Sequence, residues 1–181
     1  MGTQGSGKTL YLVKTAYEYH KKGFKVYSNF KLNFPHEILS FKDIMECKLS
    51  KCVVSLDEAS LWGLNSRESM SKKNNKITSQ FIVQLRKQDV HLFASAQLLR
   101  QLDVRVRENA DYICEAKKFA IINGVLDDSA QAMNYPKKIP IIIEVNVVRC
   151  YDSREAKIRF HANPLFSLYD TNEVIKLIGD A

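Results

Sequence analysis

Residues 2–9 of the chain read GTQGSGKT, and they match the pattern G-x-x-x-x-G-K-[ST] in full. Glycines let such a loop curl until its backbone N–H groups converge on phosphate oxygens, and the helix that follows begins with its electropositive end toward the same anion. The lysine reaches the β- and γ-phosphates, and the hydroxyl after it is a ligand of Mg²⁺. We therefore predict that the following residues bind ATP: Gly2, Gly5, Ser6, Gly7, Lys8, Thr9 and Leu10.

The loop is preceded by Met1 alone, although such loops normally follow a buried β-strand. A flexible glycine-rich terminus is the alternative interpretation, and it would be preferred if the motif stood by itself. We expect a P-loop fold whose first strand is missing from this sequence, and an apolar run of about five codons upstream of Met1 would show that the protein begins earlier. The segments downstream of the loop decide between the two interpretations.

Residues 52–58, CVVSLDE, form an apolar run that ends in two acids. This is the Walker B pattern, in which Asp57 holds Mg²⁺ through its water shell and Glu58 polarises the water that attacks the γ-phosphate. The alternative is a helix N-cap after a strand. Because the pair follows a Walker A loop within an α/β pattern, the catalytic interpretation is favoured.

Residues 90–97, VHLFASAQ, predict a neighbouring strand that ends in an amide. Gln97 is therefore a candidate for sensing the γ-phosphate and positioning water, and the alternative is a polar loop residue. Arg86 lies near the end of the helix predicted before that strand. It is either a solvated charge stabilised by the helix dipole or an arginine finger that reaches a neighbouring subunit's nucleotide. Arg105 and Arg107 are weaker candidates for the same role.

Strand-like and helix-like segments alternate as far as residues 110–119, which predicts a mostly parallel α/β sheet flanked by helices. Three strand-like segments then follow without a helix between them, and we expect antiparallel strands at the sheet edge or in a flap. A last helix is predicted from the residues after Tyr169. We predict one domain, 1–181, with a nucleotide-binding core over 1–118, a β-rich extension over 119–165 and a C-terminal helix over 166–181.

The net charge of +7 over 181 residues favours an anionic partner, although many soluble proteins carry such a charge without one. Residues 63–76 predict a mobile loop with four basic side chains, Arg67, Lys72, Lys73 and Lys76, which could grip DNA phosphates. The four cysteines form no CxxC pair, so a metal site built from them is not expected. No apolar run is long enough to cross a bilayer, and we expect a cytoplasmic protein.

Several of these segments together resemble the Zot-like (zonular-occludens-toxin-like) P-loop ATPases. The resemblance rests on residues 5–32, GSGKTLYLVKTAYEYHKKGFKVYSNFKL, on VVSLDEA, on LRKQDVHLFASAQ with LDVRVRENADY, and on the late FSLYDTNEV. These ATPases belong to the FtsK–HerA superfamily of DNA-translocating and packaging enzymes. The resemblance implies a RecA/ASCE-like P-loop fold, the roles given above for Lys8, Thr9, Asp57, Glu58 and Gln97, and a homo-oligomeric ring in which Arg86 acts in trans.

The resemblance also implies a task in viral or phage genome packaging or virion morphogenesis, in the host cytoplasm or at an assembly site with a capsid or membrane partner. The chain lacks the membrane-spanning helix of bacterial phage Zot proteins, which favours the soluble packaging type. Two hypotheses follow: an ATP-hydrolysing motor that moves double-stranded DNA, and a nucleotide-binding assembly or regulatory protein with little or no hydrolysis. A metabolic kinase or GTPase is disfavoured, because no acceptor lid or base-reading motif is present.

Overall fold

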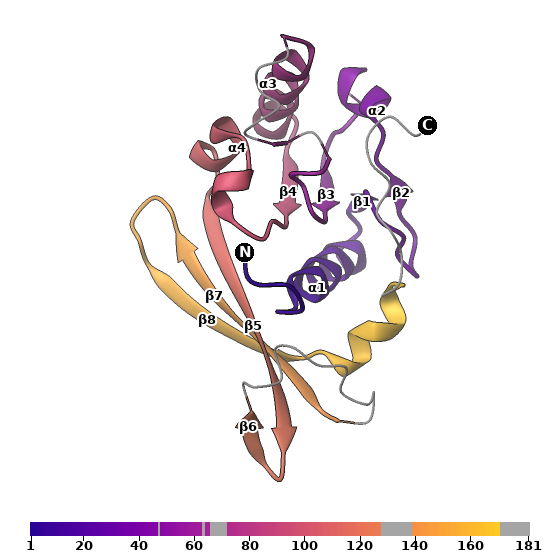
Figure 1. Ribbon diagram of the computed structural model, residues 1–181. Helices are drawn as coiled ribbons and strands as arrows, with labels where there is room; N and C mark the ends of the chain where they lie inside the picture. The colour runs from indigo at the N-terminus through magenta and orange to yellow at the C-terminus, as the bar shows by residue number, and fades with distance from the viewer. Residues whose placement is uncertain (47, 63, 66–71, 128–138, 171–181) are drawn as a thin grey trace.

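In a computed structural model, the structure describes residues 1–46, 48–62, 64–65, 72–127 and 139–170. Helices and strands alternate through the first half of the chain, and strands dominate the second half (Figure 1). In chain order the elements are α1 (Lys8–Lys21), β1 (Lys25–Ser28), β2 (Glu37–Ile38), α2 (Phe41–Met45), β3 (Cys52–Leu56), α3 (Lys72–Lys87), β4 (Val90–Ala94), η2 (Leu99–Gln101), α4 (Val104–Glu108), β5 (Tyr112–Ile122), β6 (Val125–Asp127), β7 (Ile141–Arg149), β8 (Glu155–His161) and η4 (Asn163–Leu168).

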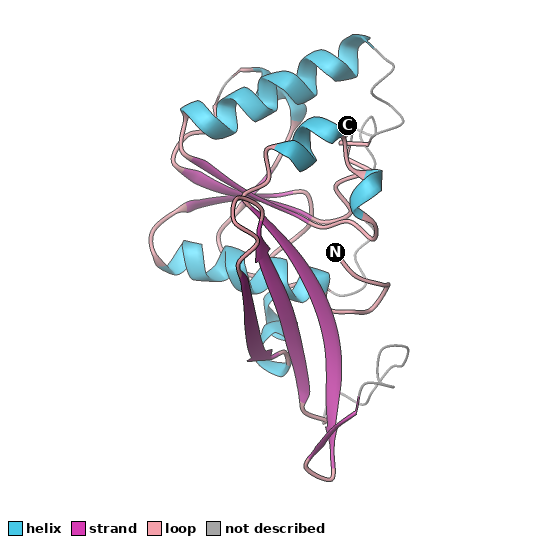
Figure 2. Ribbon diagram, turned by 90° about the vertical axis from the view of Figure 1, so that its left-hand side faces the viewer, coloured by secondary structure: helices cyan, strands magenta, loops and turns pink. Residues whose placement is uncertain are grey.

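The first sheet has the order β2-β1-β3-β4, and every neighbouring pair in it is parallel. All five side chains of β3 are buried, as expected of a strand covered on both faces. The two long helices α1 and α3 lie on opposite sides of this sheet (Figure 2). Alternate residues of the strands therefore face two cores, one with Val13 and Val26 on the α1 side and one with Val54 and Phe81 on the α3 side. The predicted parallel sheet flanked by helices is confirmed.

The second sheet is antiparallel, with the order β6-β5-β7-β8. Its apolar face packs against the start of α1, where Leu10 and Tyr11 contact a cluster that includes Ile143 and Phe160. The expectation that residues 110–119 continue the parallel sheet is wrong. β5 pairs with β7 in antiparallel register from Tyr112 to Ala120, because the helix before it, only five residues long, does not supply a crossover across the first sheet.

The other strand-like segments are antiparallel as predicted, but they form a separate sheet and do not extend the first one. α3 begins at Lys72, so residues 72–76, which the sequence placed in a mobile loop, are helical; residues 63 and 66–71 lie outside the described residues. The sequence of residues 98–109, LLRQLDVRVREN, predicts one short helix, but the structure divides it in two, because the Asp103 carboxylate accepts a hydrogen bond from Arg105 N at 2.9 Å and caps a new helix. The helix predicted after Tyr169 falls on residues 171–181, which are also outside the described residues.

Cys52 is buried in β3, and Cys114 is half-buried in β5, whereas Cys150 is exposed in the turn after β7. Burial raises the pKa of the Cys52 thiol to about 11. Within the described ranges, no helix combines the length and the apolar character needed to cross a membrane.

Candidate functional site

The glycine loop runs from the chain start into α1, and three of its glycines adopt positive φ: 143° at Gly2, 76° at Gly5 and 97° at Gly7. Two of them also lie against the antiparallel sheet. A Cβ at Gly2 would stand 2.8 Å from the backbone oxygen of Ala116 in β5, and a Cβ at Gly7 would stand 3.1 Å from Cγ1 of Ile143 in β7. Both the turn conformation and this close approach therefore require glycine.

The β5 backbone holds the beginning of the loop as well. Ala116 N donates to the carbonyl of Met1 at 3.0 Å, and the Met1 amino group donates to the carbonyl of Cys114. Burial lowers the pKa of this amino group. The antiparallel sheet thus supports the loop that the sequence predicted to bind phosphate.

Lys8 is the first residue of α1, and its side chain is buried. Its ammonium donates to the carbonyl oxygens of Gly2 at 2.9 Å and of Thr3 at 3.0 Å, so it lies across the inside of the loop. The hydroxyl of Ser6 is buried and has no hydrogen-bond partner among the described residues. Buried polar groups are usually paired, so this hydroxyl has a hydrogen bond to offer to a ligand oxygen or a water.

Thr9 and Asp57 meet where α1 begins and β3 ends. The Thr9 hydroxyl donates to Oδ2 of Asp57 at 2.7 Å. The two residues stand 48 positions apart in the sequence, and Asp57 directly follows the last residue of β3. The structure therefore brings together the two side chains that we predicted as the Mg²⁺ ligands.

Two further polar residues fix Asp57. Asn29, just beyond β1, exchanges two hydrogen bonds with the Asp57 backbone, each of 2.8 Å: its amide nitrogen donates to the carbonyl, and its amide oxygen accepts from the N–H. Ser95, just beyond β4, donates its hydroxyl to Oδ1 of Asp57. Asp57 is therefore held, by its backbone and its carboxylate, between the carboxyl ends of three adjacent parallel strands, which is where ligand sites form in open α/β sheets.

Glu58 has φ of 46°, an unusual value for a residue with a side chain. Its backbone N–H donates to the Ser95 hydroxyl at 3.0 Å and lies 3.2 Å from Oδ1 of Asp57. Its half-buried carboxylate pairs with no other side chain of the described part of the chain. The backbone is thus anchored while the acid is left available.

Gln97 lies three residues beyond β4 at the same edge of the sheet as Asp57, and it is exposed. Arg86 lies at the other edge. It is in the last turn of α3, and the residue two positions later, Gln88, accepts a 2.8 Å hydrogen bond from the N–H of Lys51 just before β3. The structure therefore does not bring Arg86 to the glycine loop of its own chain.

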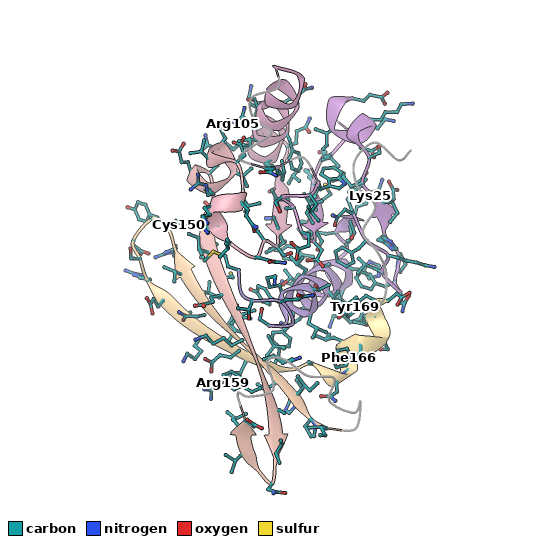
Figure 3. The ribbon with its side chains drawn as sticks, in the orientation of Figure 1. Lys25, Arg105, Cys150, Arg159, Phe166 and Tyr169 are labelled. Atoms are coloured by element: carbon teal, nitrogen blue, oxygen red, sulfur yellow. The ribbon has the colours of Figure 1, made fainter. Side chains whose placement is uncertain are left out.

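Arg105 and Arg107 are the two weaker candidates for an arginine finger. Arg105 forms an ion pair with the buried Asp103 at 2.7 Å, and it also donates to the Ser79 hydroxyl at 2.8 Å (Figure 3). Hydrogen bonding from Arg105 lowers the pKa of the Asp103 carboxyl. Nε of the half-buried Arg107 is buried and has no partner among the described residues.

Sequence reasoning missed Asn29, Ser95 and Tyr169. Asn29 lies within residues 5–32 and Ser95 lies within VHLFASAQ, so both belong to segments that carry the motif resemblance. Tyr169 belongs to the segment FSLYDTNEV, and its backbone forms an isolated antiparallel β-bridge with Leu32. Burial and the negative charge of Asp57 raise the pKa of Tyr169 to about 12. Figure 3 shows Tyr169 and Phe166 together beside α1.

No family model matches the chain, and a search of curated proteins gives no match. Among solved structures, the N-terminal domain of zonular occludens toxin from Neisseria meningitidis is similar. It superposes with a TM-score of 0.53 over 94% of this chain and 96% of that chain, at 18% sequence identity. At this level of identity the likeness shows a shared fold alone. The resemblance inferred from the motifs is supported to that extent.

The residues present fit a nucleoside triphosphate and Mg²⁺. The loop supplies positive-φ glycines, a helix N-terminus, a lysine and the unpaired Ser6 hydroxyl. Among the described residues, no group of three or more His, Cys, Asp or Glu side chains could hold a metal ion. Mg²⁺ needs no such cage, because it is usually held by one or two protein ligands together with waters and substrate phosphates. Thr9 and Asp57 can supply that number.

Proposed function

We propose that the chain is an ATPase that binds ATP·Mg²⁺ on its glycine loop and hydrolyses it. The single observation that carries the proposal is the 2.7 Å hydrogen bond between Thr9 and Asp57. It joins a hydroxyl after the glycine loop to a carboxylate after a buried strand, which is the pairing that P-loop nucleotide hydrolysis uses. The shared fold with a zonular occludens toxin domain is consistent with it.

Each predicted residue has a role in this proposal. Gly2, Gly5, Ser6, Gly7 and Leu10 form the cradle with Lys8, whose ammonium exchanges the carbonyls of the loop for phosphate oxygens. Thr9 and Asp57 would hold Mg²⁺, which when bound neutralises charge on the phosphates. Glu58 accepts a proton from the attacking water. The oxygen of that water bonds to the γ-phosphorus, and the bond from the phosphorus to the ADP oxygen breaks. Gln97 orients that water.

The experiment compares wild type with Lys8→Ala for binding of a fluorescent ATP analogue and for release of inorganic phosphate. We expect both to be lost in Lys8→Ala, and hydrolysis alone to be lost in Glu58→Gln. Lys14→Ala is the matched control, because Lys14 lies on the same helix and forms an exposed ion pair with Glu18 at 2.5 Å. Failure of wild type to bind the analogue would refute the proposal.

The motor is the finer part of the proposal: a homo-oligomeric ring that moves double-stranded DNA in packaging or virion assembly, with Arg86 acting on the neighbouring subunit's nucleotide. Its support is the motif resemblance and the net charge of +7. DNA-stimulated phosphate release with a ring-sized species in sedimentation is the expected result. ATP binding with no hydrolysis, with or without DNA, would instead indicate the second candidate, an assembly or regulatory protein. The Glu58 backbone at φ of 46° favours hydrolysis, because residues with strained backbone conformations cluster at active sites.

A further inference from the structure

We propose that the edge of the parallel sheet opposite the glycine loop binds the phosphodiester backbone of nucleic acid. This inference deepens the proposed function, since it assigns the surface on which the nucleic-acid partner would lie. The basic edge, as we call it, consists of six side chains from two helices and two strand starts: Lys21, Lys22, Lys25, Lys51, Arg86 and Lys87.

The strand register places these residues on one edge. Lys25 is level with Cys52, and Cys52 is level with Val90, so β1, β3 and β4 begin side by side at a spacing of about 4.8 Å. Lys25 opens β1, and Lys51 directly precedes β3. Figure 3 shows where Lys25 lies on the ribbon.

Both long helices end at this edge, as Figure 2 shows. The end of α3 is joined to it by the 2.8 Å hydrogen bond from Lys51 N to the Gln88 carbonyl, which brings Arg86 and Lys87 close to Lys51. The end of α1 is joined to it by a ring contact, because the Tyr19 ring lies tilted against His91 of β4 with ring centroids 5.2 Å apart. Lys21 and Lys22 follow Tyr19 closely, as the last residue of α1 and its C-cap.

All six side chains are exposed, and five of them have no acidic partner within the described residues. Lys25 is the exception, with Glu37 at 2.8 Å. Asp89 lies among them as an exposed acid, close to His91 at 3.8 Å. The edge therefore carries a clear excess of unneutralised positive charge, which is what a polyanion requires.

Complementation of the helix dipoles accounts for part of this charge, because Lys21, Arg86 and Lys87 lie in last helical turns. It does not account for Lys51, which precedes β3 and has no acidic partner among the described residues, whereas Lys25 is paired with Glu37. Lys51 has φ of 45°, a conformation that favours glycine or asparagine. The charge of Lys51 is therefore explained neither by a helix end nor by an ion pair within the described residues.

The edge fits a nucleic acid better than a protein. Protein interfaces have an apolar or aromatic core within a polar rim, whereas nucleic-acid interfaces are polar and positively charged. Among the described side chains of α1, β1, β3, α3 and β4, Val83 is the one large apolar side chain that is exposed. The cations are mostly lysines, which bind phosphate as point charges.

The position also leaves the nucleotide site free. Thr9, Asp57 and Gln97 stand at the carboxyl ends of the strands, so DNA on the basic edge does not cover the nucleotide site of the same chain. Residues 63–76, in which we predicted a DNA-gripping loop, begin on the carboxyl side of β3. The basic edge and the predicted loop share no residue, so each can be mutated without changing the other.

The experiment measures anisotropy of a labelled random-sequence DNA duplex of about 30 base pairs against salt, so that the slope counts phosphate contacts. The variant is Lys22→Gln with Lys51→Asn and Lys87→Gln, and it keeps Arg86, to which the proposed function gives a role at the neighbouring subunit's nucleotide. The matched control removes three exposed cations from the antiparallel sheet and its turn: Lys117→Gln, Arg154→Gln and Lys157→Gln. We expect the variant to bind DNA roughly tenfold more weakly, and its slope of log affinity against log salt concentration to be shallower by about 2–3. The control should change little in both quantities.

Equal behaviour of variant and control would overturn the proposal, and so would absence of DNA binding by wild type. Competition by polyglutamate as strong as that by DNA would overturn it too, since the edge would then serve an acidic protein. Binding of the fluorescent ATP analogue is recorded for each variant. Loss of DNA with ATP binding retained supports the basic edge, whereas DNA binding without ATP binding would refute the proposed function and leave this inference standing.

Discussion

The hydroxyl of Thr9 donates to the carboxylate of Asp57 at 2.7 Å, and this contact closes the gap between the start of α1 and the end of β3. The same carboxylate accepts the Ser95 hydroxyl through its other oxygen. Both carboxylate oxygens of Asp57 therefore accept hydrogen bonds, and these fix the orientation of the carboxylate. A cation that entered here would meet a carboxylate of fixed orientation, at no further cost in side-chain entropy.

The first prediction concerns Mg²⁺-dependent affinity. Thr9→Val keeps the shape of the side chain and removes the hydroxyl, so ATP affinity in Mg²⁺ should fall roughly tenfold or more, as expected for a hydrogen bond to a charged group. Affinity without Mg²⁺ should change much less. Isothermal titration of ATP with and without Mg²⁺ measures both.

The control is Thr15→Val on the same helix. The Thr15 hydroxyl donates to the Tyr11 carbonyl at 2.8 Å, so this variant removes an equivalent group away from the site. Equal losses in the two variants would mean that Thr9 acts through helix stability and not through the metal.

The second prediction concerns the support of Asp57. Asn29→Ala removes two hydrogen bonds from the Asp57 backbone, whose N–H and carbonyl lie in a half-buried region. We expect a loss of about 1–3 kcal/mol in the free energy of unfolding, because the groups left behind are unsatisfied. Urea denaturation measures it, and Mg²⁺-dependent ATP affinity should fall together with stability.

Asn109→Ala is the comparison for that loss. The Asn109 side chain donates to the Arg105 carbonyl at 2.7 Å in an exposed position, where water can replace it. A loss at Asn29 no larger than that at Asn109 would contradict the role we assign to Asn29.

The parallel sheet could be predicted from the sequence because its signals are local. The apolar run that forms β3 ends in Asp57, and the run that forms β4 precedes Gln97, so strand and site are recognisable together. Parallel order brings the carboxyl ends of neighbouring strands to one edge of the sheet. For that reason the two motifs alone suffice to predict that Thr9 and Asp57 share a site.

The partners of Asp57 could not be predicted in the same way. Asn29 and Ser95 reach it across 28 and 38 residues, and their roles depend on which strands become neighbours. The strand β5 shows the same difficulty on a larger scale. Its apolar pattern suits a strand of either sheet, and only the pairing with β7 decides the direction. The position of Arg86 at the far edge likewise follows from the length of α3.

The third prediction tests the contact between the glycine loop and the antiparallel sheet. Gly7→Ala places a methyl group against Ile143 in a residue with φ of 97°, so it combines backbone strain with overpacking. We expect about 2–4 kcal/mol of destabilisation. Gly23→Ala is the control, because Gly23 has φ of 86° but nothing within 4 Å of the added Cβ, and it should cost only the backbone part.

A double-mutant cycle with Ile143→Val identifies the contact. Removing Cδ1 of Ile143 should relieve part of the cost of Gly7→Ala, so the two free-energy changes should be less than additive. Additive changes would show that strain alone explains the result and that the sheet does not press on the loop.

The fourth prediction concerns the exposure of the thiols. Cys150 is exposed, whereas Cys52 is buried and the pKa of its thiol is raised to about 11. A short alkylation near neutral pH, followed by peptide mass spectrometry, should modify Cys150 in the folded protein and leave Cys52 unmodified until denaturant is added, because the thiolate is the reactive form. Early modification of Cys52 would contradict the packing of β3.

The last prediction concerns Tyr169 and the charge of Asp57. Burial and that charge raise the pKa of the phenol from 10.0 to about 12 in the folded protein. The folded state thus retains a proton that the unfolded state releases above pH 10. Stability from this group is complete below the ordinary pKa and declines as the pH rises toward the folded value.

Urea midpoints measured near pH 9 and near pH 11 should therefore fall more for wild type than for Tyr169→Phe, which has no phenolic proton to hold. Tyr11 also titrates late, at about 12, and it is present in both proteins, so the difference isolates Tyr169. Asp57→Asn removes one of the two causes of the shift, and ultraviolet titration of that variant should show a phenol with a lower pKa than in wild type. An unchanged titration would separate Tyr169 from the Asp57 charge and would leave burial as the sole cause, because a neutral amide at position 57 cannot oppose a phenolate.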